Sequence, residues 1–133
     1  QNLTDEWKER GITEQRDYSI LTAEIAKATF GVTPSEHKEI KGLTKKSQNL
    51  RDHMTDLELI FTMLGERVTT EVSQKEKPGD FGESIKVARR GGGVAGVARK
   101  AAEKELGHSV ISTQNFLDKN PDSLLAETPI GSD

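Results

Sequence analysis

Cysteine is absent from the 133 residues, and aromatic residues are scarce, with one Trp, one Tyr and four Phe. The lack of cysteine excludes disulfides, thiolate metal sites and cysteine nucleophiles, and it fits a reducing cytoplasm. No run of residues approaches the roughly 18 apolar positions of a membrane helix, and no signal peptide is visible. We therefore expect a cytoplasmic protein that needs no membrane.

The composition suits one folded domain with a modest core. Hydrophobic residues make up 32% of the chain and charged residues 31%, and the formal net charge is -3. We expect the folded domain to cover residues 1–117 and a poorly ordered tail to cover 118–133, where Asn120-Pro121 precedes a polar stretch. The chain begins at Gln1 rather than Met, which we interpret as the start of a fragment of a longer protein.

Nothing in the sequence shows the period-two alternation of β-strands, whereas helix start and stop signals recur along it. Thr4 is expected to cap a short first helix, and Thr13 is expected to cap a second helix that stops at Gly31. Thr33-Pro34-Ser35-Glu36 and Thr55-Asp56-Leu57-Glu58 both carry the capping-box pattern, in which Glu follows the Thr cap by three residues. The sequence therefore predicts an all-α fold, a single compact domain of about five helices.

The clearest amphipathic pattern predicts a central helix over residues 56–74. Its apolar residues recur at three- and four-residue steps and so share one face; they are Leu57, Ile60, Phe61, Leu64, Val68 and Val72. We expect Phe61, Leu64 and Val68 to lie in the core. Further along, Val110-Ile111 is a candidate segment for docking back onto the domain.

Residues 82–106 also look helical, but Gly91-Gly92-Gly93 lies in the middle of them. Each glycine costs about 1 kcal/mol relative to alanine inside a helix, so the three together predict a glycine-rich break or kink. Two interpretations stay open: a hinge, or small residues (Gly92, Ala95 and Gly96) that let another helix approach closely. A phosphate-binding loop is disfavoured, because Val97 follows Gly96 where such a loop needs Lys and then Ser or Thr.

The sequence offers no pattern for catalysis or for binding a metal or cofactor. His37, His53 and His108 show no HExxH spacing and no cluster of surrounding carboxylates, so we expect them to be structural or solvated. Asp56 and Glu58 are interpreted as first-turn carboxylates that the helix dipole favours. We therefore expect no catalytic residue, no metal, no cofactor and no small-molecule substrate, and hence no enzyme.

Two basic blocks, bounded by acidic stretches, are the stronger functional signal. Residues 38–51 hold five basic residues and one acidic residue, and residues 86–104 hold six basic residues and one acidic residue. Lys and Arg beside turns and helix starts can reach phosphates. The candidate nucleic-acid contacts are Lys38, Lys41, Lys45, Lys46, Arg51, Arg89, Arg90, Arg99 and Lys100. Because no aromatic residues are interleaved with them, we prefer a solvated or partner-facing role to direct DNA contact.

The chain resembles the C-terminal region of the DNA-damage-inducible protein D family and of related phage-type proteins that carry a Bro-N antirepressor domain. The resemblance covers roughly residues 30–110. It is carried by Lys41-Gly42-Leu43, Lys45-Lys46, Leu50, Asp52-His53-Met54 and Glu58-Leu59, with a weaker echo in Arg99-Lys100 and Glu105-Leu106-Gly107. The stretch Gly91–Gly96 and the tail depart from the damage-inducible pattern and are closer to the Bro-N relatives.

The resemblance implies a cytoplasmic stress or prophage regulator, involved in the SOS response and with recombinase filaments on DNA. For the Bro-N relatives it implies that DNA binding belongs mainly to an N-terminal domain that this chain does not include. We expect a non-catalytic regulatory module that mediates protein contacts, with itself or with a recombinase filament, and that has DNA as an accessory partner. The alternative is a direct DNA-binding domain that uses the two basic blocks.

Overall fold

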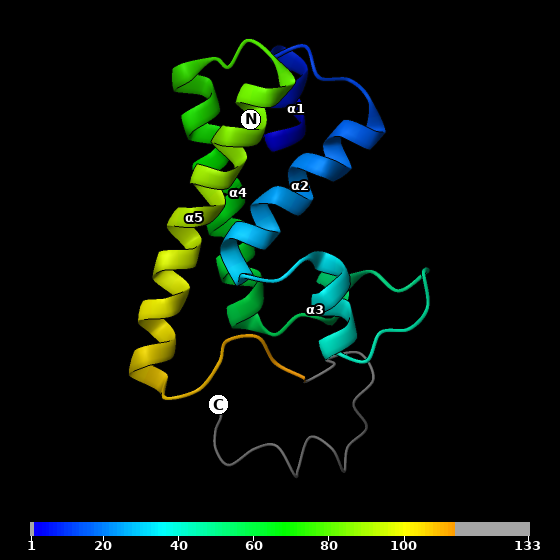
Figure 1. Ribbon diagram of the computed structural model, residues 1–133, viewed down its shortest axis with the longest axis vertical. Coiled ribbons are helices and arrows are strands. Elements are labelled where there is room, and N and C mark those ends of the chain that lie inside the picture. Colours follow the sequence, from blue (N-terminus) through cyan, green and yellow to red (C-terminus); the bar gives the residue numbers. More distant parts are fainter. Residues whose placement is uncertain (1, 114–133) are drawn as a thin grey trace.

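The computed structural model describes residues 2–113, which form five α-helices, one short 3-10 helix and no strand (Figure 1). The elements are α1 (Leu3–Glu9), α2 (Gln15–Phe30), α3 (Pro34–Ile40), the 3-10 helix η1 (Leu50–His53), α4 (Asp56–Glu76) and α5 (Phe81–Leu106). The predicted all-α fold of a single compact domain is thereby confirmed. The tail predicted over 118–133 lies outside the described residues.

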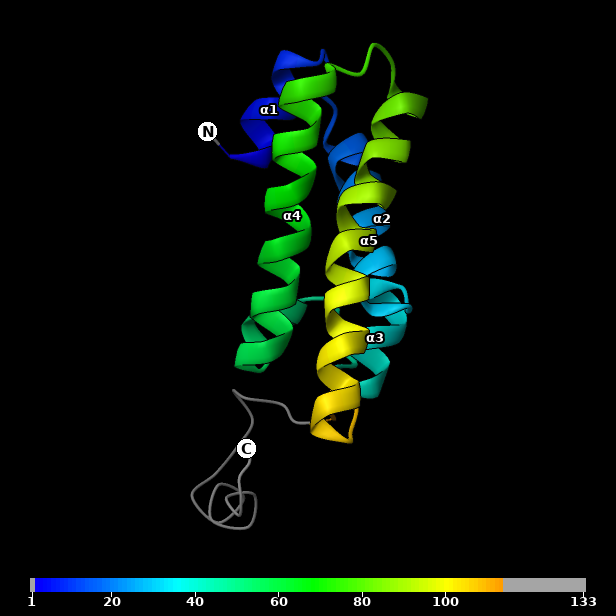
Figure 2. The ribbon, with the colours of Figure 1, turned by 90° about the vertical axis from the view of Figure 1, so that its left-hand side faces the viewer.

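Three long helices, α2, α4 and α5, form the body of the domain. α5 packs along both α2 and α4, whereas α2 and α4 contact each other less. Figure 2 shows α4 and α5 running side by side, with α2 behind α5. α1 packs against α4 at one end of the body, and α3 and η1 lie at the other end (Figure 1).

Local sequence signals set several helix boundaries as predicted. The Thr33 and Thr55 side chains each accept a hydrogen bond from the amide of the Glu three residues later, and that Glu returns one to the amide of the Thr. Both capping boxes are therefore confirmed. α2 and α5 end at Gly31 and Gly107, whose φ angles of 76° and 79° are left-handed and favour glycine.

The starts of the first two helices differ from the prediction. Asn2, not Thr4, caps α1, and its side chain accepts a hydrogen bond from the Asp5 amide at 2.8 Å. Asparagine is as strong an N-cap as serine or threonine, so it can start the helix two residues earlier. α2 follows Glu14 rather than Thr13, and no side chain caps it. Ile12, which precedes this start, is buried in the core.

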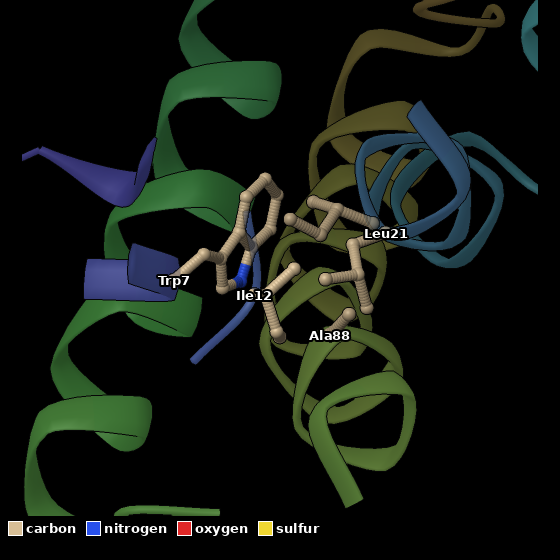
Figure 3. Close-up of a cluster of buried hydrophobic side chains, with 5 residues drawn as sticks. Trp7, Ile12, Leu21 and Ala88 are labelled. Carbon is tan, nitrogen blue, oxygen red and sulfur yellow. The ribbon is translucent and has the colours of Figure 1, made fainter. Parts of the chain in front are cut away.

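Two clusters of buried apolar side chains lie at opposite ends of the body. The upper core cluster comprises Trp7, Ile12, Leu21, Ile25 and Ala88, contributed by α1, the loop after it, α2 and α5 (Figure 3). The lower core cluster comprises Phe30, Met54, Phe61 and Val110. The burial of Phe61 and Val110 confirms a core position on α4 and a docking segment after α5.

The predicted glycine-rich break is wrong, because α5 continues as one helix through all three glycines. The middle of the body is packed too closely for larger side chains. A Cβ atom at Gly91 would lie 2.7 Å from the Cα atom of Thr69 on α4, and one at Gly92 would lie 2.8 Å from the Cβ atom of Ala28 on α2. α5 is therefore in close contact with both α4 and α2. This arrangement fits the second interpretation of the glycines, in which small residues let another helix approach closely.

The buried face of α4 also differs from the predicted apolar stripe. Phe61 is buried, but Val68 is only half-buried, Leu64 packs at the edge of the lower core cluster, and Ile60 is 55% exposed. The buried positions of α4 other than Phe61 are small or polar: Glu58, Gly65, Thr69, Thr70 and Ser73. The close approach of α5 requires small side chains, so the larger apolar residues lie at the edge of the α4–α5 pair.

Candidate interaction site

Three of the predicted nucleic-acid contacts are exposed arginines that form ion pairs within the domain. The pairs are Arg51 with Glu66 at 2.6 Å, Arg89 with Glu24 at 2.8 Å, and Arg90 with Glu76 through two hydrogen bonds of 2.8 Å each. Exposed ion pairs are weak. A phosphate could therefore reach these arginines, but only by displacing a carboxylate that already neutralises each one.

Two further predicted contacts, Arg99 and Lys41, are buried. The Nε atom of Arg99 donates to the Thr29 carbonyl at 2.7 Å, which satisfies the C-terminal end of α2, and its Nη1 atom donates to Glu103 at 2.8 Å. Lys41 pairs with the buried Glu58 at 2.7 Å. Neither cation can contact a phosphate unless the domain rearranges.

The remaining four predicted contacts have no ion pair among the described residues; they are Lys38, Lys45, Lys46 and Lys100. The first three belong to α3 and the loop that follows it, while Lys100 lies on α5. Arg89 and Arg90 point to opposite flanks of α5, because one pairs with α2 and the other with α4. Arg89 and Arg90 therefore do not form one basic surface.

A buried polar network surrounds Glu58, whose side chain is fully enclosed. The Nε2 atom of His37 donates to one carboxylate oxygen at 2.7 Å, and Lys41 Nζ lies 2.7 Å from the other. Lys41 also donates to the Ser112 carbonyl at 2.9 Å, and the Ser112 amide donates to Glu58 at 3.2 Å. The network therefore ties α3, α4 and the segment after α5 together.

The network keeps Glu58 ionised. Burial opposes the charged form, but hydrogen bonds from His37, Lys41 and the Thr55 amide outweigh it and lower the pKa of Glu58 to about 2. An ionised carboxylate has no proton to give, so His37 must donate through Nε2. The His37 and Glu58 side chains are 2% and 0% exposed, so a substrate cannot touch this pair. We assign it as a structural clamp.

Helix geometry places a set of apolar residues on the side of α5 that faces away from α2. Gly91 contacts α4, and Gly92, about 100° further round the helix, contacts α2. Val94 follows Gly91 by three residues, so it is rotated about 60° in the opposite sense, away from α2. Val97 and Ala101 continue this stripe at three- and four-residue steps.

A matching stripe on α4 is the outer part of the predicted apolar face. Gly65 contacts both α2 and α5, and the next residue, Glu66, lines a groove together with residues of α2. Leu64 precedes Gly65 and so turns to the side away from α2, and Ile60 and Val68 lie one turn on either side of it. We refer to Ile60, Leu64, Val68, Val94, Val97 and Ala101 as the α4–α5 face.

The α4–α5 face is open to solvent. Val97 is 72% exposed, Ile60 55% and Val94 49%, the three highest values for branched aliphatic side chains of the described residues. In Figure 2 the two helices lie in front, α2 lies behind them, and no other helix of residues 2–113 crosses them. A group of exposed apolar side chains of this kind marks an interaction surface more often than an isolated one does.

Comparison with family models, with curated proteins and with solved structures gives no match for this chain. Within residues 2–113 no helix is long and apolar enough to cross a membrane. No group of three or more metal-binding side chains in the same range is placed to hold a metal ion.

Proposed function

We propose that this chain is a non-catalytic interaction module of a cytoplasmic DNA-damage-response or phage-type regulator. It works through protein contacts, and DNA is at most an accessory partner. The resemblance to the damage-inducible family supplies the biological setting, with a recombinase filament as the expected partner. The observation that carries the proposal is the α4–α5 face, which leaves apolar side chains exposed on the two longest helices.

The arrangement of the cations supports protein contact over direct DNA binding. Five of the nine candidate contacts already have an acidic partner inside the domain. A DNA site needs several cations that act together, because phosphate contacts supply most of the non-specific affinity. Arg89 and Arg90 also lie on opposite flanks of α5, so one duplex cannot engage both arginines with the same face.

Direct DNA binding remains the second candidate, because Lys38, Lys45 and Lys46 lie close together in the chain and have no ion pair within residues 2–113. Three phosphate contacts would give a salt slope of about -3 in a plot of log K against log salt. We expect binding to labelled DNA weaker than micromolar at about 0.15 M salt. Sub-micromolar binding that Lys45→Glu/Lys46→Glu abolishes, and Lys8→Glu/Lys27→Glu preserves, would make DNA binding the better assignment.

The protein-contact proposal is tested by binding the whole chain to a recombinase filament assembled on single-stranded DNA. Val97→Glu should weaken this binding about tenfold or more, because it puts a charge into an apolar contact. Val97 is largely exposed, so the substitution leaves the fold intact. Ile20→Glu on α2, where the side chain is 38% exposed, is the matched control and should bind as the parent does. Equal binding by all three proteins, or binding by none, would count against the proposal.

A further inference from the structure

We propose that residues 107–113, which follow α5, form a strap that opens while the three long helices stay folded, and that its opening uncovers the lower core cluster. In Figure 1 the strap is the orange segment that runs from the lower end of α5, below α4, toward α3. It contains no helix or strand, and near its end Ser112 contacts Glu58 in the first turn of α4. The inference does not depend on the proposed function.

The strap is attached to the domain by hydrogen bonds to side chains. Among the described residues, no backbone–backbone hydrogen bond joins 108–113 to the helices. Instead, the Val110 amide donates to the Glu103 carboxylate at 2.9 Å. The Ser112 amide donates to Glu58 at 3.2 Å, and the Ser112 carbonyl accepts from Lys41 at 2.9 Å. The backbone of the strap is therefore held by three charged side chains.

Each of these charged side chains keeps an ionic partner when the strap leaves. Glu103 stays paired with Arg99 at 2.8 Å, and Glu58 and Lys41 stay paired with each other at 2.7 Å. The backbone groups that the strap releases can bind water instead. Removing a partner is most costly when it leaves a buried charge or polar group unpaired, and opening of the strap avoids that cost.

The strap also buries few apolar side chains of its own. Val110 is 3% exposed and belongs to the lower core cluster, Ile111 and Ser112 are half-buried, and the other four residues of the strap are exposed. α5, by contrast, packs along both α2 and α4. A segment with few buried apolar contacts opens locally at a lower free energy than the helices that enclose the core. The strap should therefore open without unfolding of the helices.

Opening of the strap uncovers large apolar side chains that it helps to enclose. Phe30, Met54 and Phe61, the other members of the lower core cluster, are 2%, 7% and 7% exposed while Val110 packs with them. Phe30 comes from α2 and Phe61 from α4, and Met54 follows η1. Departure of Val110 therefore exposes an apolar site that α2, α4 and the end of η1 share.

Thiol labelling of the whole chain tests the inference. The chain has no cysteine, so Val110→Cys and Thr70→Cys each supply one reporter, at positions that are 3% and 2% exposed. Thr70 lies on α4, so its reporter becomes accessible only when a long helix opens. With Ellman's reagent we expect Val110→Cys to react at least about a hundredfold faster than Thr70→Cys. Equal rates in two variants with the circular dichroism of the parent would overturn the inference.

Hydrogen exchange of the parent chain tests the strap without a substitution in the cluster. The amides of Val110 and Ser112 should exchange at least about tenfold faster than the amide of Ala95, in the middle of α5. Ser112→Pro removes the amide that donates to Glu58, so it should speed exchange at Val110 about tenfold further and leave Ala95 unchanged. Thr113→Ala, at an exposed position, is the control and should exchange like the parent.

Two results of the exchange experiment would contradict the inference. In the parent, Val110 and Ser112 could exchange as slowly as Ala95. In Ser112→Pro, exchange could accelerate equally at Val110 and Ala95. Either result would mean that the strap and the long helices open together, so that the strap belongs to the cooperative core.

Discussion

Replacement of Glu58 by glutamine is expected to destabilise the domain by about 3–5 kcal/mol, which is the usual cost of breaking a buried ion pair by removing one partner. The amide keeps the size of the carboxylate, but it leaves the buried Lys41 ammonium without its counter-charge. One amide oxygen also cannot replace both carboxylate acceptors. Urea unfolding of the parent and the Glu58→Gln variant at neutral pH measures the difference.

Two further variants separate the loss of the network from a general effect of removing a carboxylate. Glu66→Gln breaks the exposed pair with Arg51 and should cost less than about 1 kcal/mol. Lys41→Met combined with Glu58→Gln should recover part of the stability that Glu58→Gln alone loses, because no unpaired ammonium is then buried. If Glu58→Gln costs no more than Glu66→Gln, the clamp is not a stabilising feature.

The same network should make the domain sensitive to acid. The folded-state pKa of Glu58 is lowered to about 2 from its ordinary value of 4.5, so the stabilisation is complete above pH 4.5 and is lost as the pH falls toward 2. A pKa difference of this size corresponds to on the order of 3 kcal/mol. The stability gap between the parent and Glu58→Gln should therefore narrow between pH 5 and pH 3, measured by urea unfolding. A gap that stays constant over this range would contradict the assigned pKa.

Alanine substitutions at two adjacent glycines should have opposite effects on stability. Gly92→Ala is expected to destabilise the domain by about 1–3 kcal/mol, because the new methyl group would overlap the carbonyl oxygen and Cα atom of Ile25 in the α2 backbone. Gly93→Ala meets nothing within 4 Å and should stabilise the domain by about 1 kcal/mol through its helix propensity. Thermal melts of the two variants give the sign directly.

Comparison of Gly92→Ala with Gly93→Ala isolates the effect of the contact between α5 and α2. Both substitutions add the same methyl group to the same helix, so any difference between them comes from the contact with α2. If both variants were stabilised, α5 would not approach α2 as closely as the structure indicates. If both were destabilised, the helix would require glycine flexibility at these positions, and the predicted hinge would return as the better description.

Local signals in the sequence predict the parts of the fold that depend on neighbours within four residues. The capping boxes at Thr33 and Thr55 and the stops at Gly31 and Gly107 are all present, because each depends only on adjacent backbone groups. The exception is α1, where Asn2 offers an equally good cap upstream of Thr4. In such a case local chemistry leaves two choices, and the sequence alone does not select between them.

Features that depend on distant residues could not be predicted in the same way. Lys41 looked like a phosphate contact within a basic block, but its partner Glu58 lies 17 positions further along the chain and its other partner, Ser112, belongs to the last described segment. The burial of α4 likewise differs from the prediction, because the amphipathic pattern shows which residues are apolar but not how close α5 comes. The small residues on α5 allow this close approach. Their effect depends on which helix they contact, and the sequence does not show that.

The continuity of α5 through its three glycines also has a consequence for cooperativity. In isolation, the α5 segment should be unfolded around its three glycines, because they cost about 3 kcal/mol of helix propensity there. Docking onto α2 and α4 must supply that free energy, so α5 cannot persist as a straight helix once either neighbour detaches. The three long helices should therefore unfold together in one transition, and no two of them should form a stable intermediate.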